Sequence, residues 1–451
     1  EAWGYDKAQV AGEAQVAGEA RVSGNAWVSG NAWVYGEAWV YAWADYDVAV
    51  GVEQIVEHRD GLHAEVSVRS LDGGHLHWAK LNLSTTTARS ALGKHLSAVS
   101  PAVPWTQICE QVCVRTAREW REGEPACDLA ALPIPVGDRY LLPPVLPENE
   151  TTVVYGPGGS LKSTLALALA VAVVTGERVV PGIGASHAPR TALYLDWESN
   201  ADEHAERLRW LARGLGLAAV PTVHYRPMYR AVADDERRIS ELRMELGAQF
   251  VVYDSLAGAC AGDLNDAEVA MRALLAMRRI GGTRLAVAHV TAQDSSNTGA
   301  AKIFGSTFFT NYARSTWEAR AGEERLPDAT QESERVVGLF HRKVNRGRLV
   351  RKPLTIGVCW QQDALRFVPA TLTEDSDVAA HAPLSVQLRE ALRRGSSTTG
   401  ELAELLGLGT DSDAHRLTNT LRRMPDVTRL DDQGPGRGQM ATWGLSGVAQ
   451  R

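Results

Sequence analysis

The chain has 451 residues and a mass of 48.8 kDa, a length typical of about two to four domains. Hydrophobic residues make up 45% of the chain and charged residues 22%, which excludes a globally disordered protein. The net charge of -7 excludes a polycation, and five cysteines in this length exclude a disulfide scaffold.

Apolar segments in the chain are too short to cross a bilayer. The best candidate is Leu165–Val174, which follows a glycine-rich loop and falls far below the length of about 20 residues that a membrane helix needs. No signal segment is visible at the start of the chain. We therefore expect a cytoplasmic protein without a membrane partner.

A six-residue repeat occupies the first 46 residues. Residues 10–45 read VAGEAQ VAGEAR VSGNAW VSGNAW VYGEAW VYAWAD, with Val first and Ala fifth in each unit. This period fits neither a helix nor a hairpin and indicates a solenoid. It resembles the hexapeptide repeats of left-handed β-helices, in which three hexads form one coil. Six hexads then form two coils, and we expect them to pack on another domain or on a second copy.

The repeat favours a structural or oligomerising platform. Acyltransferases that carry hexapeptide repeats use a catalytic His and a long extra loop, and both are absent here. Trp27, Trp33 and Trp39 share one repeat position and predict an aromatic ladder. That ladder is either a surface for a protein partner or a surface covered by the rest of the chain.

Residues 47–130 predict a small α+β domain without a catalytic constellation. We expect strands over 64–69 and 75–81 and amphipathic helices over 85–99 and 105–121. Two features leave a metal site open as an alternative to ordinary packing. They are the cysteines Cys109, Cys113 and Cys127 and the pair His75 and His77.

A strand, a glycine-rich loop and an apolar helix follow one another after a proline-rich stretch at 131–147, which we interpret as a linker. The strand spans 151–155, the loop and the residues after it read GPGGSLKST from Gly156 to Thr164, and the helix spans 165–174. This order is the context of a phosphate-binding P-loop. The loop predicts a nucleotide site formed by Gly156, Gly158, Gly159, Ser160, Leu161, Lys162, Ser163 and Thr164.

Two residues of the loop have defined chemical roles, and one departs from the usual pattern. Lys162 would contact the β- and γ-phosphates of ATP, and Ser163 would ligate Mg²⁺. Leu161 stands where the pattern has Gly, and a Cβ held in the left-handed region costs about 1–2 kcal/mol.

Polar residues end three later apolar strands. The strand over 191–195 precedes Asp196 and Glu198, the strand over 250–253 precedes Asp254, and the strand over 284–288 precedes His289. The carboxyl ends of parallel strands meet at one edge of a sheet. We expect Asp254 to hold the Mg²⁺ shell and Glu198 to position the attacking water, with Asp196 as the alternative base. His289 either contacts the γ-phosphate or is structural.

The succession of these motifs resembles the RecA-like ATPase core. Within that class, residues 146–370 resemble the AAA-domain proteins related to the RepA hexameric replicative helicase. The later motifs that carry this resemblance are Phe304-Gly-Ser306, Asn311-x-x-Arg314-x-x-Trp317 and Lys343-x-Asn345-Arg346-Gly347.

The resemblance implies a ring of identical subunits, which we expect to be a hexamer. It also assigns roles to three basic residues. Arg314 would act near the phosphates. Lys343 and Arg346 would be fingers that enter the site of a neighbouring subunit, or else solvated charges on a hairpin. The Lys that often follows the strand-end His in this group is missing, and its role is vacant or passes to Lys302. The loop at 295–301 would face single-stranded DNA in a pore, or is an ordinary loop.

The tail after a linker at 371–383 resembles a winged helix-turn-helix. Helices are expected over 384–394, within 397–407, where the segment has a capped start and a Gly stop, and over 413–424. Two strands with a Gly-rich tip would form the wing. The tail is either a duplex-DNA reader or a protein-contact module. Its predicted DNA contacts are Arg416, Asn419, Arg422, Arg423 and Arg437.

The sequence therefore predicts an α/β fold with a RecA-like P-loop core and a mostly parallel sheet. The predicted parts are a hexapeptide-repeat β-helix segment at 1–46, a small α+β domain at 47–130, a linker at 131–147, the ATPase domain at 148–370, a linker at 371–383 and a winged helix-turn-helix at 384–451. The expected function is Mg²⁺-dependent ATP hydrolysis coupled to DNA translocation or unwinding in replication or mobile-element maintenance. The alternative is a nucleotide-gated DNA-binding regulator or remodelling factor without helicase activity.

Overall fold

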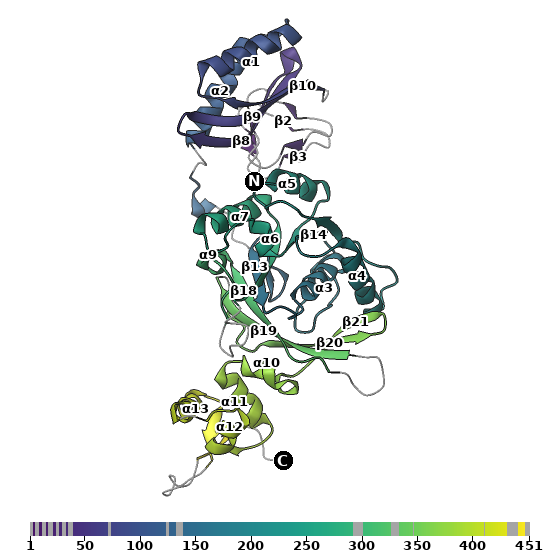
Figure 1. Cartoon of the computed structure of the whole chain (residues 1–451), viewed down its shortest axis with the longest axis vertical. Helices are drawn as coiled ribbons and strands as arrows, with labels where there is room; N and C mark the ends of the chain where they lie inside the picture. The colour runs from purple at the N-terminus through teal and green to yellow at the C-terminus, as the bar shows by residue number, and fades with distance from the viewer. Residues whose placement is uncertain are drawn as a thin grey trace. The chain divides into compact units, whose positions relative to one another are not determined.

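The computed structural model of the chain describes most of its length (Figure 1). The described residues are the short strands before residue 39 and the ranges 39–70, 74–122, 126–131, 139–291, 301–325, 333–345, 347–409, 411–430 and 441–446. The chain divides into two compact units. The first contains residues 1–137, 235–245 and 276–281, and the second contains 138–234, 246–275 and 282–451. Among the described helices, none combines the length and the hydropathy that a membrane crossing requires.

Short parallel strands recur through the hexapeptide repeat. They are β1 (Trp3–Gly4), β2 (Gln9–Val10), β3 (Gln15–Val16), β4 (Arg21–Ser23), β5 (Trp27–Val28), β6 (Trp33–Val34) and β7 (Trp39–Trp43). Strands β1, β4 and β7 pair in one stack, β2 pairs with β5, and β3 pairs with β6. Each pairing joins residues 18 positions apart, such as Trp3 with Arg21, which equals three hexads. The β-helix itself stays a proposal, and the side chains of the Trp ladder lie outside the described residues.

An antiparallel sheet covered by two helices forms the rest of the first unit's core. Strand β7 continues through β8 (Val48–His58) and β9 (Gly61–Ser70) to β10 (His75–Asn82), after the 3-10 turn Ala44–Tyr46. Buried residues alternate along β8 and β9, and this face packs against α1 (Thr86–Val99) and α2 (Trp105–Glu122). A short 3-10 helix, Leu129–Ala131, follows. The sequence missed β8 and predicted the other strands and both helices.

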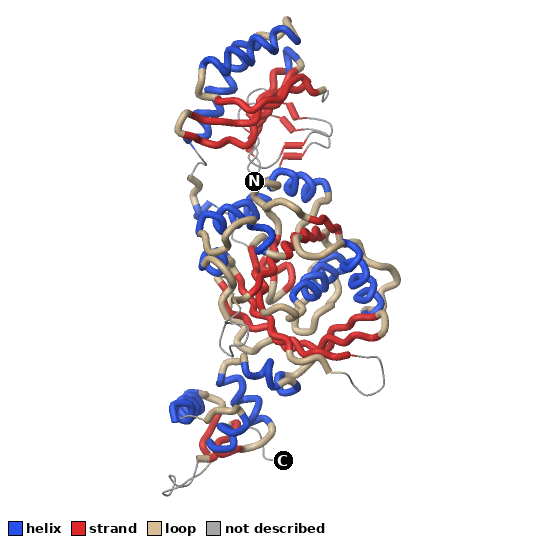
Figure 2. Tube along the Cα trace, viewed as in Figure 1, coloured by secondary structure: helices blue, strands red, loops and turns tan. Residues whose placement is uncertain are grey.

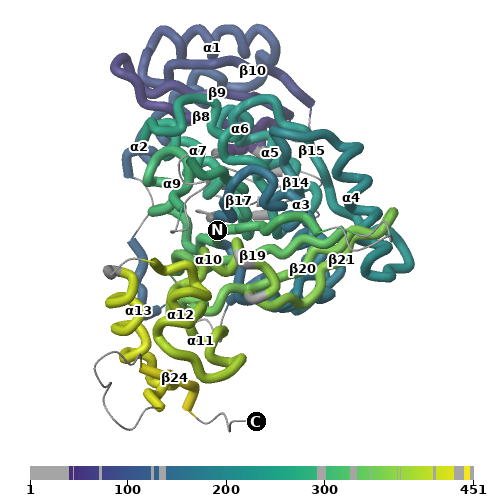
Figure 3. Tube along the Cα trace, turned by 60° about the horizontal axis from the view of Figure 1, so that its bottom comes forward, coloured from purple at the N-terminus to yellow at the C-terminus, as the bar shows by residue number. Residues whose placement is uncertain are grey.

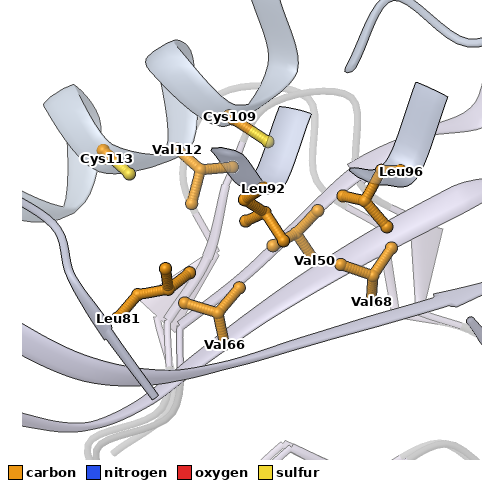
Figure 4. A pocket seen from close by; sticks show the side chains of 9 residues that line it. All are labelled: Val50, Val66, Val68, Leu81, Leu92, Leu96, Cys109, Val112 and Cys113. Atoms are coloured by element: carbon orange, nitrogen blue, oxygen red, sulfur yellow. The ribbon is translucent and has the colours of Figure 1, made fainter. Parts of the chain in front are cut away.

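The cysteines of α2 are part of this apolar core. Cys109 and Cys113 line a small pocket with Val50, Leu92 and other aliphatic side chains (Figure 4). Burial raises the pKa of Cys109 to about 11 and that of Cys113 to about 12, so both stay thiols at neutral pH. Among the described residues, no three His, Cys, Asp or Glu side chains form a metal-binding group. The metal alternatives for the cysteines and for the pair at 75 and 77 therefore find no support.

The second half of the proline-rich stretch is not a linker, which corrects the sequence interpretation. Strands β11 (Tyr140–Leu142) and β12 (Leu146–Pro147) pair with each other, and Leu142 and Leu146 are fully buried. Both leucines belong to the core of the second unit together with helix α3. The prolines end short strands here, while the leucines between them supply the packing.

A nine-stranded sheet forms the centre of the second unit. Its order is β15-β14-β16-β17-β13-β18-β19-β20-β21. The strands from β15 to β18 are parallel, and each later strand runs antiparallel to its neighbour. This mixed α/β unit with a large, mostly parallel sheet fits a RecA-like core. The bounds are β13 (Thr151–Gly156), β14 (Ala192–Asp196), β15 (His224–Pro227), β16 (Phe250–Asp254), β17 (Thr283–His289), β18 (Ser315–Ala321), β19 (Ser333–Val344), β20 (Leu354–Gln361) and β21 (Ala364–Pro369).

Helices flank this sheet, whose strands are red in Figure 2. Helix α3 (Lys162–Thr175) is apolar on all sides because it is buried between the sheet and its neighbours. Helix α4 (Ala201–Gly214) begins at Asn200, whose side chain caps the backbone N–H of Glu203. The second unit also contains α6 (Leu256–Cys260), α9 (Thr307–Tyr312) and most of α7 (Ala267–Ile280), whereas α5 (Glu236–Glu245) belongs to the first unit.

The expected linker at 371–383 is also packed, which is a second correction. A 3-10 helix, Leu372–Glu374, leads into α10 (Ser376–Ala380). Their residues Leu372 and Val378 are buried against Val336 and Phe340 of β19. This cluster also includes Val386, so it connects the sheet to the helices that follow.

Three helices and a small sheet end the chain (Figure 3). Their shared core contains Leu388, Leu402, Leu417 and Trp443. Strand β24 pairs with both β22 and β23. The winged helix-turn-helix stays a proposal for this arrangement. The bounds are α11 (Leu384–Arg393), α12 (Thr399–Leu405), α13 (Asp411–Arg423), β22 (Ser397–Thr398), β23 (Val427–Arg429) and β24 (Thr442–Leu445).

Candidate functional site: a phosphate loop at the carboxyl edge of the sheet

Four neighbouring parallel strands bring the predicted polar residues to one edge of the sheet. In the register of these strands, Gly156 lies opposite His289, and Asp196 lies opposite Asp254. Strand β16, which ends at Asp254, lies between β14 and β17. The loop that follows Gly156 and the carboxylates after β14 and β16 therefore share the carboxyl edge, as the sequence predicted.

Glycine is required at two kinds of position in the loop. A Cβ on Gly156 would lie 2.2 Å from the carbonyl oxygen of Ala319, so no side chain fits against β18. Gly159 has a φ of +72°, and a Cβ at Gly158 or Gly159 would meet no atom within 4 Å. Open space therefore lies in front of these two glycines, where the loop's amide groups would surround a phosphate.

Leu161 adopts the left-handed conformation that the pattern normally assigns to glycine. Its φ is +60° and its ψ is 24°, directly before helix α3 begins at Lys162. The Leu161 side chain packs against the core of the second unit. This packing offsets part of the backbone cost of about 1–2 kcal/mol.

The Lys162 ammonium group lies inside the loop. Its Nζ donates to the carbonyl oxygens of Gly156 at 3.0 Å and Pro157 at 2.7 Å, and lies 3.4 Å from Oγ of Ser160. Burial lowers the pKa of Lys162 to about 8, and the charges of Asp254 and Glu198 act in the opposite direction. The oxygens of a bound phosphate would replace these carbonyls as acceptors.

Asp254 has the features of a magnesium-shell carboxylate. Its Oδ2 accepts a hydrogen bond of 2.5 Å from the hydroxyl of Tyr194, a residue that the sequence analysis did not single out. Among the described residues, Oδ1 of Asp254 is buried without a hydrogen-bond partner. Burial raises the pKa of Asp254, whereas the hydroxyls of Tyr194 and Ser163 lower it. A cation beside Oδ1 and the Ser163 hydroxyl would supply the missing partner, so these residues fit Mg²⁺.

Glu198, Ser255 and His289 lie together after three strands. The Oγ of Ser255 donates to Oε1 of Glu198, and Nε2 of His289 lies 3.4 Å from the same oxygen. The hydrogen bond from His289 is the main cause that lowers the pKa of Glu198. Glu198 is therefore a carboxylate at neutral pH, which is the form that accepts a proton from water. Sequence reasoning missed Ser255, although it directly follows Asp254.

Asp196 is occupied by structural hydrogen bonds. Its Oδ1 accepts from the backbone N–H groups of Glu198 and Ser199, and its Oδ2 accepts from the hydroxyl of Tyr225 and lies 3.1 Å from Nε2 of His204. Burial raises the pKa of Asp196, but these hydrogen bonds outweigh it and bring the pKa to about 2. Asp196 thus orients the start of the segment that carries Glu198.

Arg314 and Lys343 lie at the opposite, amino edge of the same sheet. The backbone N–H of Arg314 donates to the carbonyl of Thr151, the first residue of β13, whereas the loop follows the last. At about 3.3 Å per residue, this places Arg314 about 16 Å from the loop of its own chain. The expectation that Arg314 acts near the phosphates is therefore wrong for its own nucleotide site.

Lys343 is a helix cap rather than a free side chain. Its Nζ donates to the carbonyls of Thr310, Asn311 and Ala313 at 2.7–2.8 Å, which are the orphan acceptors at the end of α9. Burial lowers the pKa of Lys343. Arg346 lies outside the described residues.

The other late motifs have structural contacts. Trp317 is fully buried and stacks on His341, with ring centroids 4.2 Å apart. Ser306 caps α9 through the backbone N–H of Phe308. Phe304 is exposed. Most of the loop at 295–301 lies outside the described residues.

Helix α13 presents four of the five predicted DNA contacts to solvent. Leu417 and Leu421 are buried on one side of the helix. The residues exposed on its other side are Arg416, Asn419, Arg422 and Arg423. Arg437 lies outside the described residues.

Comparison with known protein families agrees with the carboxyl-edge site. Residues 128–295 match the model of a family described as an AAA domain. The match includes the loop, both carboxylates and His289, and it ends before Arg314 and Lys343. No curated protein matches the chain. The match supports a P-loop AAA-type ATPase.

Proposed function

We propose that the chain is a Mg²⁺-dependent ATPase of the RecA-like class that assembles into a ring and acts on DNA. The observation that carries the proposal is the carboxyl edge of the sheet. A glycine loop, a buried lysine, an ionised glutamate and a carboxylate oxygen without a partner among the described residues lie together there. The AAA-domain match adds independent support for nucleotide hydrolysis. The more specific relation to the RepA hexameric helicase rests on the sequence motifs.

Binding begins with the loop and the first turn of α3. The amide groups of Gly158–Ser163 surround the β-phosphate, and Lys162 moves from the carbonyls of Gly156 and Pro157 to the β- and γ-phosphate oxygens. Thr164 completes this first turn. Ser163 and Asp254 hold Mg²⁺, which supplies charge neutralisation of the phosphates when bound.

Hydrolysis is a direct attack of water on the γ-phosphorus. The new bond forms between the water oxygen and phosphorus, and the bond to the oxygen between the β- and γ-phosphates breaks. Glu198 orients the water and accepts its proton as the new bond forms, and the ADP leaving group keeps the oxygen of the broken bond. Ser255 and His289 hold the Glu198 carboxylate. His289 would respond to the γ-phosphate through this carboxylate, which its Nε2 approaches to 3.4 Å.

A neighbouring subunit would complete the site. An arginine that stabilises transition-state charge contributes about 10³–10⁵ in rate. Arg346 is our candidate for this finger, and Arg314, at the amino edge of the sheet, is a second. Because the amino edge is remote from the loop of the same chain, Arg314 would act only on the nucleotide of a neighbouring subunit in a ring, for which we propose a hexamer.

DNA would contact two parts of the chain. The exposed face of α13 suits the phosphates and base edges of a duplex, as in a winged helix-turn-helix. The loop at 295–301 would line the pore for single-stranded DNA. The hexapeptide repeat, as a short left-handed β-helix, would provide a platform for assembly or for a protein partner.

The decisive experiment measures ATP turnover against added single-stranded DNA together with the native mass of the assembly. A motor hydrolyses ATP faster with DNA and has the mass of a ring. A slow rate that DNA leaves unchanged, with duplex binding retained, indicates the nucleotide-gated regulator instead. Lys162→Ala is the reference variant, and unchanged turnover in this variant would contradict the P-loop assignment itself.

A further inference from the structure

Arg335 of β19 contacts the phosphate loop from outside the motif. Its Nη1 donates to the carbonyl oxygen of Gly159 at 2.8 Å, although the two residues are 176 positions apart. Arg335 belongs to none of the sequence motifs and has no part in the proposed hydrolysis. Gly159 is one of the two glycines that border the open phosphate space.

This hydrogen bond fixes one peptide group of the loop. In a trans peptide, the C=O and the N–H point in opposite directions. Holding the Gly159 carbonyl toward Arg335 therefore turns the N–H of Ser160 toward the inside of the loop. In the part of the chain that the structure describes, the contact of that N–H is a long one of 3.4 Å with the carbonyl of Pro157, so a phosphate oxygen can take the place of this carbonyl.

The same guanidinium group is anchored at a second carbonyl. Nε of Arg335 donates to the carbonyl of Gly322 at 2.6 Å, just after the end of β18. Two donors in a rigid fork hold the guanidinium in one orientation, which a lysine ammonium cannot reproduce. Arg335 thus joins the loop to the end of the neighbouring strand.

Gly322, whose carbonyl holds Arg335, is packed against the segment that leads to the C-terminal helices. A Cβ on Gly322 would lie 1.8 Å from Oδ2 of Asp375, so the glycine and this carboxylate are in close contact. Asp375 is buried and its Oδ1 accepts from the backbone N–H groups at the start of α10. Arg325 pairs with the same carboxylate at 3.7 Å.

We propose that Arg335 is a positioning residue for the phosphate loop, held at Gly322 and acting on Gly159. It orients the amide of Ser160 for a nucleoside diphosphate or triphosphate and does not itself take part in the chemistry. The proposal rests on the proposed function, because it assumes that the loop binds nucleotide phosphates.

The test measures equilibrium binding of a fluorescent ADP analogue by purified full-length variants, so that hydrolysis is not required. Arg335→Gln is expected to weaken binding about tenfold, the size of one charge-assisted hydrogen bond that orders a binding group. Arg335→Lys keeps the charge but not the fork and is expected to recover part of the loss. Arg366→Gln removes an exposed arginine from β21 of the same sheet and is the matched control, with unchanged binding.

Two results overturn the proposal. One is binding by Arg335→Gln within twofold of the unchanged chain. The other is a loss that disappears once the unfolded fraction, measured by thermal unfolding in the same buffer, is subtracted. The variant Lys162→Ala distinguishes a failure of the Arg335 proposal from a failure of the proposed function. If Lys162→Ala binds as the unchanged chain does, the loop is not a phosphate site at all.

Discussion

The two edges of the nine-stranded sheet differ in what they hold. At the carboxyl edge, residues from four strands converge on one space, and an oxygen of Asp254 is left without a partner among the described residues. At the amino edge, Lys343 is held by three carbonyls and Arg314 lies near Glu150, with Nε and Oε2 3.7 Å apart. The carboxyl edge leaves a polar atom for a ligand to contact. At the amino edge, the basic side chains are largely paired with groups of their own chain.

This difference separates two classes of functional residue. Groups that act on the nucleotide of their own chain must lie at the carboxyl edge, where the loop is. Residues of the amino edge reach a nucleotide only if a second copy presents its carboxyl edge to them. Assembly-dependent catalysis is therefore testable separately from nucleotide binding.

Arg346→Ala is expected to have the largest effect, because it tests whether a neighbouring subunit completes the site at all. As a finger in trans, its loss should lower kcat by about 10³-fold or more. In mixed assemblies, the variant subunits should inactivate the sites of unchanged neighbours, so activity falls faster than their fraction. The matched control is Arg348→Ala, two residues later in the sequence, where the side chain is exposed. If turnover of the mixed assemblies is proportional to their fraction of unchanged subunits, Arg346 does not act in a neighbouring site.

Glu198→Gln tests the carboxyl edge within one chain. The amide keeps the shape but cannot accept a proton from water, so kcat should fall by about 10²–10⁴-fold while nucleotide binding persists. Single-turnover hydrolysis and equilibrium binding measure the two effects. Glu206→Gln on the exposed side of α4 is the control. Full activity in Glu198→Gln would require another base, and the hydrogen bonds of Asp196 argue against that residue.

The contrast between the edges also explains what the sequence could predict. Glu198, Asp254 and His289 were predictable because each follows an apolar strand, and parallel strands end at the same edge. The location of Lys343 was not predictable. Strand β19 runs antiparallel to β18, and the residues of the Lys343 motif do not indicate which strand it pairs with.

Long-range packing accounts for the remaining differences between the sequence predictions and the structure. Prolines predicted a linker around Leu142, yet the burial of that leucine depends on helix α3, which comes later in the chain. Arg335 lies in an ordinary strand pattern, and its partner in the loop is far away in sequence. Only the folded chain shows such contacts.

Lys343→Met tests the capping role that the structure gives this residue. Loss of charge-assisted hydrogen bonds to the end of α9 should lower the free energy of unfolding by about 2 kcal/mol. Chemical denaturation measures this change. Because the ammonium is engaged by its own chain, kcat per folded subunit should stay within a few-fold. A loss comparable to that of Arg346→Ala would instead make Lys343 a second finger.

The pKa of Lys162 predicts how nucleotide affinity depends on pH. Bound phosphates favour the charged ammonium, whereas the free site loses that charge as the pH rises through about 8. Binding of the ADP analogue should therefore be constant below pH 8 and weaken above it, by up to about tenfold per pH unit. Lys162→Arg keeps its charge throughout and should bind with little dependence on pH in this range. The same slope in that variant would assign the titration to another group.

Leu161 provides the smallest and most local test of the carboxyl edge. Leu161→Ala keeps a Cβ at a φ of +60° and loses the packing of the leucine side chain, whereas Leu161→Gly loses the packing but relieves the strained backbone. The glycine variant should be the more stable of the two by about 1 kcal/mol, despite its more flexible unfolded state. Thermal unfolding of both variants measures the difference. If the alanine variant is as stable as the glycine variant, the left-handed conformation carries little strain. The packing of the Leu161 side chain in the core then has no backbone strain to offset.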